Sequence, residues 1–307
     1  MNNSSRLLSM WLFLSLLALF MWSGSDLFSK LGCQDKSEKT SPLKMVIAVG
    51  LVMGLHAGYE VLFKGIEFSW QVILIYLPVS ALYIISMAIG YFGLRYIELS
   101  ISSPICNTSG ALVVVFYIIM GTRPDLKVLT GVAFTLIGIL GLGIVEYKED
   151  EVARAERQKA SNMKYHKSLL AIILPIIYSL IDALGTFADS LVLETLDEAQ
   201  ANVAYEMTFF LIGLIIFAVL LLRGDFMITK SDRPKIVASL FETGGQVAYI
   251  YAISANVVSS APIISCYSLL TVIWGRVFLK EKLTWKHYTS IGLAIAGIVI
   301  LAIFDSS

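Results

Sequence analysis

YFGLRYIELSISSP at residues 91–104 decides the fold of this chain, because YIYAISANVVSSAP at residues 249–262 repeats its aromatic start and its serine-proline end. The two copies lie 158 residues apart, and one inserted residue then aligns Gly138-Ile139 with Gly297-Ile298. Both copies lie in strongly apolar sequence. Internal repeats in a membrane-embedded chain are typical of secondary transporters, whose binding sites lie at the interface between the repeats.

The composition predicts an integral, multi-pass membrane protein. Apolar residue types make up 57% of the 307 residues, charged residues make up 15%, and the mean hydropathy is +0.78. A soluble domain carries about 25% charged residues. No basic stripe is present, so we expect no nucleic-acid partner. The three cysteines cannot all pair, and two lie in apolar stretches. We interpret them as small hydrophobic residues.

Ten hydrophobic stretches are long enough to cross a bilayer, which requires about 20 apolar residues for a helix. Helices are expected because a lone strand cannot satisfy its backbone polar groups in lipid. We therefore predict an all-α membrane protein with ten transmembrane helices. The predicted spans are residues 7–29, 43–63, 70–95, 102–120, 127–146, 168–191, 202–222, 235–254, 261–279 and 286–304.

The repeat divides the chain into three parts. Residues 1–147 are predicted to form a first five-helix repeat, and residues 168–307 a second one. Residues 148–167 form a charged loop between them, and its charges alternate in sign, as is typical of a short solvated helix.

The first span resembles a cleavable signal peptide, because a positive charge precedes an apolar run and small residues follow it. However, Trp22 and Asp26 match Tyr178 and Asp182, which lie 156 residues later in the second repeat. Removal of the first span would break the first repeat. We therefore expect this span to be retained.

The distribution of Lys and Arg predicts the orientation. With ten spans both termini lie on one side, which holds four of the 23 basic residues, whereas the other side holds nineteen. Cytoplasmic loops carry an excess of Lys and Arg. We therefore predict a protein of the plasma membrane with both termini outside and residues 148–167 in the cytoplasm.

Several carboxylates lie within the predicted spans, whereas no Lys or Arg lies near the middle of any span. Asp182 and Glu242 lie deepest and Asp26 somewhat less deep. An acidic residue at the centre of a membrane helix costs about 2.5–3.5 kcal/mol, so it usually faces a cavity or a partner. We predict that these carboxylates bind substrate and that Asp182 and Glu242 also exchange protons between the two sides.

Aromatic side chains lie at helical spacing from these carboxylates. Trp22 and Asp26 are four residues apart, as are Tyr178 and Asp182, so each pair shares a helix face. A carboxylate beside aromatic rings suits a cationic or zwitterionic amine, through ion pairing and cation–π attraction. We predict substrate-binding roles for Trp22, Asp26, Tyr83, Tyr178, Asp182, Glu242, Gln246, Tyr249 and Tyr267.

Other polar residues favour structural roles. Glu60 and Glu206 lie near span ends, where we expect them to snorkel or to cap helices. His56 is four residues from Glu60 and is expected to pair with it rather than bind a metal. Pro104 and Pro262 are expected to open the fourth and ninth spans, because proline suits the first helical turn.

The second half resembles the EamA-type branch of the drug/metabolite transporter superfamily. The resemblance lies in the aromatic start of residues 249–262, in Ser260-Ala261-Pro262, and in Leu279-Lys280-Glu281-Lys282-Leu283, a Leu-x-Glu-x-Leu pattern typical of that family. The first repeat reads Gly121-Thr122-Arg123-Pro124 at the corresponding place and departs from the pattern there.

The resemblance implies two inverted five-helix repeats around a cavity lined mainly by helices one, three, four, six, eight and nine. Relatives in the superfamily move amino acids, choline, nucleotide sugars and other metabolites, so the fold does not identify the cargo.

We predict a secondary transporter, with export favoured, for an amine, an amino acid or another cationic or zwitterionic solute. It would work by alternating access, with proton coupling as one option; uniport and import stay open. No catalytic residues, cofactor or metal are expected, and the partners are the substrate, the lipid bilayer and at most a second copy. Two alternatives are a membrane-embedded metal enzyme using Asp182 and Asp189, and a sensor or assembly protein whose carboxylates pair internally and leave no cavity.

Overall fold

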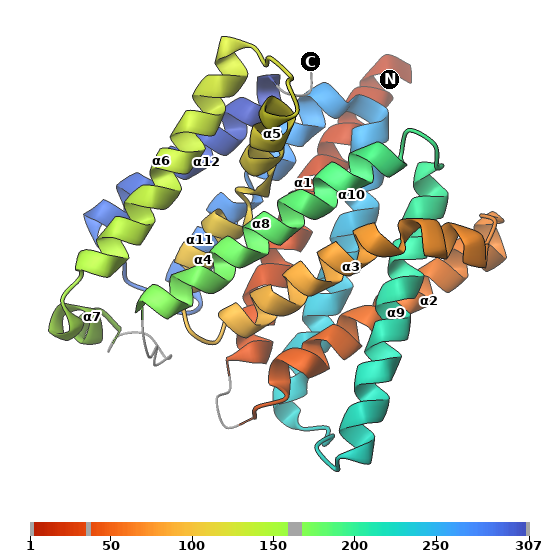
Figure 1. Ribbon diagram of the computed structural model, residues 1–307, viewed down its shortest axis with the longest axis horizontal. Coiled ribbons are helices and arrows are strands. Elements are labelled where there is room, and N and C mark those ends of the chain that lie inside the picture. The colour runs from red at the N-terminus through yellow and green to blue at the C-terminus, as the bar shows by residue number, and fades with distance from the viewer. Residues whose placement is uncertain (1–2, 35–37, 159–167, 305–307) are drawn as a thin grey trace.

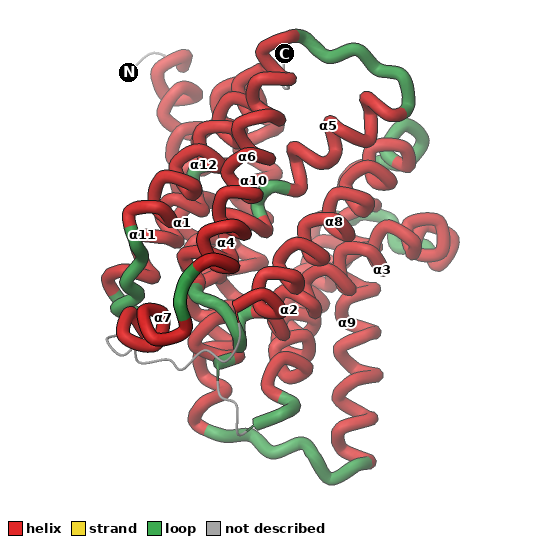
Figure 2. The backbone as a smooth tube through the Cα atoms, turned by 60° about the vertical axis from the view of Figure 1, so that its left-hand side comes forward, coloured by secondary structure: helices red, strands yellow, loops and turns green. Residues whose placement is uncertain are grey.

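The computed structural model describes residues 3–34, 38–158 and 168–304, and every regular element within them is helical (Figures 1 and 2). The helices are α1 (Asn3–Cys33), α2 (Ser41–Lys64), α3 (Trp70–Gly93), α4 (Leu99–Cys106), α5 (Ser109–Ile119), α6 (Leu126–Lys148), α7 (Glu151–Gln158), α8 (Ser168–Val192), α9 (Glu198–Leu222), the short 3-10 helix η1 (Lys230–Asp232), α10 (Arg233–Ser265), α11 (Tyr267–Val277) and α12 (Trp285–Phe304).

Eight segments of the described chain are long and apolar enough to cross a membrane: Met10–Cys33, Ser41–Lys64, Trp70–Gly93, Leu99–Ile119, Leu126–Val145, Ala171–Val192, Glu198–Leu222 and Trp285–Phe304. The all-helical, multi-pass class is thus confirmed. The predicted eighth and ninth spans have no counterpart among these segments. Their residues lie in α10, which carries polar residues such as Glu242 and Gln246, and in α11, which has only 11 residues.

Two predicted helix starts are wrong. The structure has no break at residues 255–260, so Pro262 lies inside α10, and Pro104 is the sixth residue of α4. Helix α4 begins earlier because the carboxylate of Glu281 accepts the backbone N–H groups of Leu99 (2.8 Å) and Ser100 (2.9 Å). These first N–H groups of a helix lack partners within it. Glu281, which is distant in the sequence, therefore determines where α4 begins.

Helices from the two halves pack in pairs. Helix α1 packs along α10, α2 along α9, α3 along α8, and α6 along α12. The last pair approaches closely at glycines: a Cβ on Gly138 would lie 2.4 Å from the backbone nitrogen of Ala294, and one on Gly297 would lie 2.4 Å from that of Thr135. Small residues at such crossings let membrane helices approach each other.

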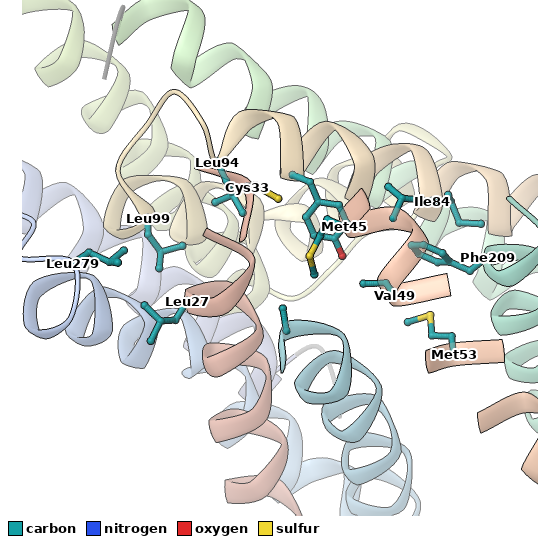
Figure 3. Close-up of a cluster of buried hydrophobic side chains, with 13 residues drawn as sticks. Leu27, Cys33, Met45, Val49, Met53, Ile84, Leu94, Leu99, Phe209 and Leu279 are labelled. Carbon is teal, nitrogen blue, oxygen red and sulfur yellow. The ribbon is translucent and has the colours of Figure 1, made fainter. Parts of the chain in front are cut away.

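A buried apolar cluster joins α1, α2, α3 and α4 to α9 and to the α11–α12 connection (Figure 3). Figure 3 labels ten of its residues: Leu27, Cys33, Met45, Val49, Met53, Ile84, Leu94, Leu99, Phe209 and Leu279. We call this group the central cluster. Cys33, Cys106 and Cys266 are free thiols, as expected from the sequence.

The start of α1 and the end of α12 lie at the same end of the bundle, opposite the α6–α7 connection (Figures 1 and 2). We call the end that holds both termini the terminal end, and the end that holds the α6–α7 connection the basic end. The short helix predicted in the charged loop is present as α7. The last part of that loop, residues 159–167, lies outside the described residues.

Candidate functional site

A cavity of about 520 Å³ lies among the helices of the two halves. This volume is in the range of small-molecule sites. Helices α1, α3, α4, α5, α8, α10 and α11 contribute lining residues, and these residues represent all six predicted spans that the family resemblance implied. Helix α9 contributes as well, which the sequence did not predict.

All nine residues predicted to bind substrate line this one cavity. They come from five helices: Trp22 and Asp26 from α1, Tyr83 from α3, Tyr178 and Asp182 from α8, Glu242, Gln246 and Tyr249 from α10, and Tyr267 from α11. The structure thus brings the whole predicted set together. Their role in binding stays a prediction.

The lining carries five carboxylates, Asp26, Asp182, Asp189, Glu198 and Glu242, and no Lys, Arg or His. Four of them are only half-buried, although they lie inside the bundle, because they border the cavity; Glu198 is exposed. Within the described residues, no cationic side chain forms an ion pair with any of the four interior carboxylates. The site is therefore negatively charged when these groups are ionised.

The carboxylate of Asp26 connects three helices. It accepts a hydrogen bond from the hydroxyl of Ser103 on α4 (2.5 Å) and another from Thr271 on α11 (3.2 Å). Glu242 on α10 accepts one from Ser25 on α1 (2.7 Å). Hydroxyl groups can give way to a bound cation at little cost, because they can turn and donate elsewhere.

Two further carboxylates lie between α3 and α8. Asp182 accepts a hydrogen bond from Ser86 at 3.4 Å. Asp189 accepts one from the phenol of Tyr76 at 2.6 Å and one from Tyr83 at 3.5 Å. Tyr76 pairs with Asp189 and Ser86 pairs with Asp182, as expected for two helices that run antiparallel.

Aromatic rings cluster beside Asp26. The ring of Trp22 lies 5.1 Å from that of Tyr249 and 5.8 Å from that of Tyr267, centroid to centroid. These three rings come from α1, α10 and α11. Their faces carry partial negative charge, which attracts cations. The arrangement can therefore hold an ammonium group by a carboxylate and by aromatic faces.

Two buried polar atoms of the lining have no hydrogen-bond partner within the described part of the chain. They are the indole nitrogen of Trp22 and the hydroxyl of Tyr91. Leaving a buried polar group unsatisfied costs about 1–3 kcal/mol.

The cavity reaches the surface at the terminal end and is closed at the basic end. Glu198, at the start of α9, is exposed and lines it. Leu94 and Leu99 of the central cluster line its other end and are at most 8% exposed (Figure 3). They form the floor.

Charged groups lie beyond this floor. Lys30 is fully buried, and its ammonium donates to the carbonyl oxygens of Leu94 and Ile97. Farther out, Lys44 and Lys235 both pair with Asp232. Partial burial acts to raise the pKa of Asp232, but the hydrogen bond from Lys235 and the charge of Lys44 together hold it below the usual value.

His56, Glu60 and Glu206 lie outside the cavity lining. His56 contacts Glu60 at 3.4 Å, as expected, and also Glu206 at 2.9 Å. The expectation that Glu206 snorkels or caps a helix is wrong, because it is fully buried between α2 and α9 with His56 as its partner. Glu60 also pairs with Lys64 at 2.8 Å.

No group of three or more His, Cys, Asp or Glu side chains in the described residues could hold a metal ion. Asp182 and Asp189, which the enzyme hypothesis assigned to a metal, are two helical turns apart, or about 10.5 Å along α8. A single ion does not bridge that distance.

The sequence analysis missed several lining residues. Tyr76 precedes Tyr83 by seven residues, and this helical spacing could have indicated it. Tyr205 lies on α9 beside Glu206, which the sequence placed near a span end and in a structural role, so no local signal indicated Tyr205.

Comparison with known proteins connects this geometry to a family. The sequence model of the EamA-like transporter family matches residues 169–303. No curated protein gave a significant match. A solved structure titled "Crystal structure of protein" is similar over 95% of this chain and 96% of that chain, with a TM-score of 0.51 and 13% identity, which shows likeness of fold alone. Residues 169–303 therefore match the EamA-like transporter family, which belongs to the drug/metabolite transporter superfamily, and this match together with the apolar helices supports a multi-pass membrane protein of the transporter type.

Proposed function

We propose that the protein is a secondary transporter that moves a small cationic or zwitterionic amine across the plasma membrane by alternating access. The observation that carries this proposal is a cavity between the two halves with five carboxylates and no basic residue in its lining. Buried carboxylates are costly unless they meet a partner. A sensor whose carboxylates pair internally would need no such cavity.

The packing pairs support ten spans in two inverted repeats. In this arrangement α4 with α5 is the fourth span, and the end of α10 with α11 is the ninth. If the halves are repeats, the first span (α1) corresponds to the sixth (α8), and the third span (α3) corresponds to the eighth (α10). The packing of α1 against α10 then corresponds to the packing of α8 against α3, and both contacts are present. Alternating access is then a rocking of one repeat against the other around the cavity.

The proposal includes export and proton coupling, and the placement of charge supports both. With ten spans, the sequence assigns nineteen of the 23 Lys and Arg residues to the side opposite both termini, so we place the basic end in the cytoplasm. The cavity in this structure then opens outward, which is the state in which an exporter would release its cargo. Asp182 and Glu242 interact with hydroxyl groups rather than with fixed cations. They can therefore exchange a proton for an amine.

Reconstituted vesicles test this proposal. An amine gradient should drive proton movement, read with a pH-sensitive dye, and Asp182→Asn and Glu242→Gln should each slow it at least tenfold. Glu194→Gln is the matched control, because Glu194 is exposed in the α8–α9 connection and does not line the cavity. If both cavity variants fold and keep the wild-type rate and pH dependence, the proposal is wrong.

A further inference from the structure

Two carboxylates of the cavity share one face of one helix at a fixed separation. Asp182 and Asp189 lie on α8 seven residues apart, and both line the cavity. Seven residues make almost two full turns of an α-helix, so the side chains point in nearly the same direction, about 10.5 Å apart along the axis. The cavity therefore has an inner and an outer anionic position.

The outer position is built around Asp189. The phenol of Tyr76 donates to one carboxylate oxygen at 2.6 Å, and that of Tyr83 lies 3.5 Å from the other. Two aromatic side chains thus border this carboxylate. An ammonium group there can pair with the carboxylate and contact the ring faces. Glu198 at the cavity mouth adds a further negative charge.

The inner position offers acceptors for a second ammonium group. Asp182 accepts hydrogen bonds from two hydroxyl groups, those of Ser109 and of Ser86, the latter at 3.4 Å. Glu242 on α10 lines the same cavity and accepts a hydrogen bond only from the hydroxyl of Ser25 among the side-chain bonds of the described residues. An ammonium group has three donors and no acceptor. The carboxylates of Asp182 and Glu242 supply acceptors for those donors.

The lining between the two positions is uncharged. Tyr83 contacts Thr186 at 3.2 Å, and the hydroxyl of Tyr205 donates to the sulfur of Met87 at 3.2 Å. All four side chains line the cavity. Their ring and methylene surfaces suit an aliphatic chain, because apolar contact there displaces water without leaving a charge unsolvated.

We propose that the cavity is built for an elongated dication, a linear amine with an ammonium group near each end, rather than for a monoamine. The proposal rests on the function proposed above and names its substrate class. One ammonium group binds at Asp182 and the other at Asp189. An extended chain advances about 1.2 Å per bond, so roughly nine bonds, as in an eight-carbon diamine, separate the two charges.

The test uses three probes at pH 7 on the purified full-length protein in nanodiscs: 1,8-diaminooctane, 1-aminooctane and 1,3-diaminopropane. Isothermal titration should give at least tenfold tighter binding of 1,8-diaminooctane than of either other probe. Apolar burial alone predicts the opposite order for the two eight-carbon probes, because 1-aminooctane is the more apolar. Asp189→Asn should remove the preference for the diamine and leave 1-aminooctane binding within about threefold of wild type. Glu194→Gln should change neither.

The outcomes separate the two proposals. If the wild type binds 1-aminooctane as tightly as 1,8-diaminooctane, or if folded Asp189→Asn keeps the preference, the dication proposal is wrong and amine transport stands. If folded wild-type protein binds none of the three amines, the proposed function fails together with it. The ratio measured in the wild type does not depend on whether any variant folds.

Discussion

At the scale of single residues, Lys30 is notable as a fully buried cationic side chain. Its side chain is fully buried on α1, and its ammonium donates to the carbonyl oxygens of Leu94 and Ile97, just after the end of α3. A cation is favourable there because the last carbonyl groups of a helix lack partners and carry partial negative charge. Lys30 thereby holds the floor of the cavity in place.

Lys30→Met tests this role. The substitution keeps the apolar stem and removes the donors, so it leaves two buried carbonyl oxygens unsatisfied. We expect a loss of about 1–3 kcal/mol in the free energy of unfolding. Thermal unfolding in detergent should show a lower midpoint, whereas Lys148→Met, at an exposed position at the end of α6, should leave it unchanged. An unaltered midpoint for Lys30→Met would contradict the role.

At the scale of elements, the α3–α4 connection is held from both sides by buried charges. Lys30 contacts the end of α3, while Glu281 contacts the start of α4 through Leu99 and Ser100. Each charge has the sign that its helix end favours. Glu281 is the central residue of the Leu-x-Glu-x-Leu pattern in the second half. The pattern therefore acts on a helix of the other half.

A graded pair of variants tests the cap. Glu281→Gln keeps one acceptor oxygen and should cost less than Glu281→Ala, which leaves both N–H groups buried without a partner. We expect the Ala variant to lose about 1–2 kcal/mol, as for other N-cap deletions. Amide hydrogen exchange should accelerate at Leu99 and Ser100 in the order wild type, Gln, Ala. Equal exchange in all three proteins would show that Glu281 is not the cap.

At the scale of the whole molecule, the cavity opens at the terminal end. Because the sequence assigns nineteen of the 23 basic residues to the side opposite the termini, we expect the mouth to face the outside of the cell. The variant Glu198→Cys, made after Cys33, Cys106 and Cys266 are replaced by Ala, tests this. A membrane-impermeant maleimide should label it in intact cells. Lys148→Cys in the same background should be labelled only after permeabilisation. The reverse result would invert the orientation.

The sequence predicted most of what depends on local pattern. Asp182 and Glu242 could be found because a carboxylate within a long apolar run is conspicuous, and their aromatic neighbours follow at helical spacing. The start of α4 could not be found, because it depends on Glu281, 182 residues away. The preference of proline for the first turn of a helix depends only on neighbouring residues, so it placed Pro104 at the helix start. Tyr91 was visible in the repeat, but its unpartnered hydroxyl depends on what packs around it.

The cap on α4 also has a consequence for biosynthesis. Leu99 leaves the ribosome 182 residues before Glu281 does. At roughly 5–20 residues per second, translation takes about 10–40 s to supply the missing carboxylate. During that interval the first turn of α4 has no native partner for its N–H groups, and the floor of the cavity cannot close. The first half therefore reaches its native arrangement at the cavity floor only after nearly all of the polypeptide has been made.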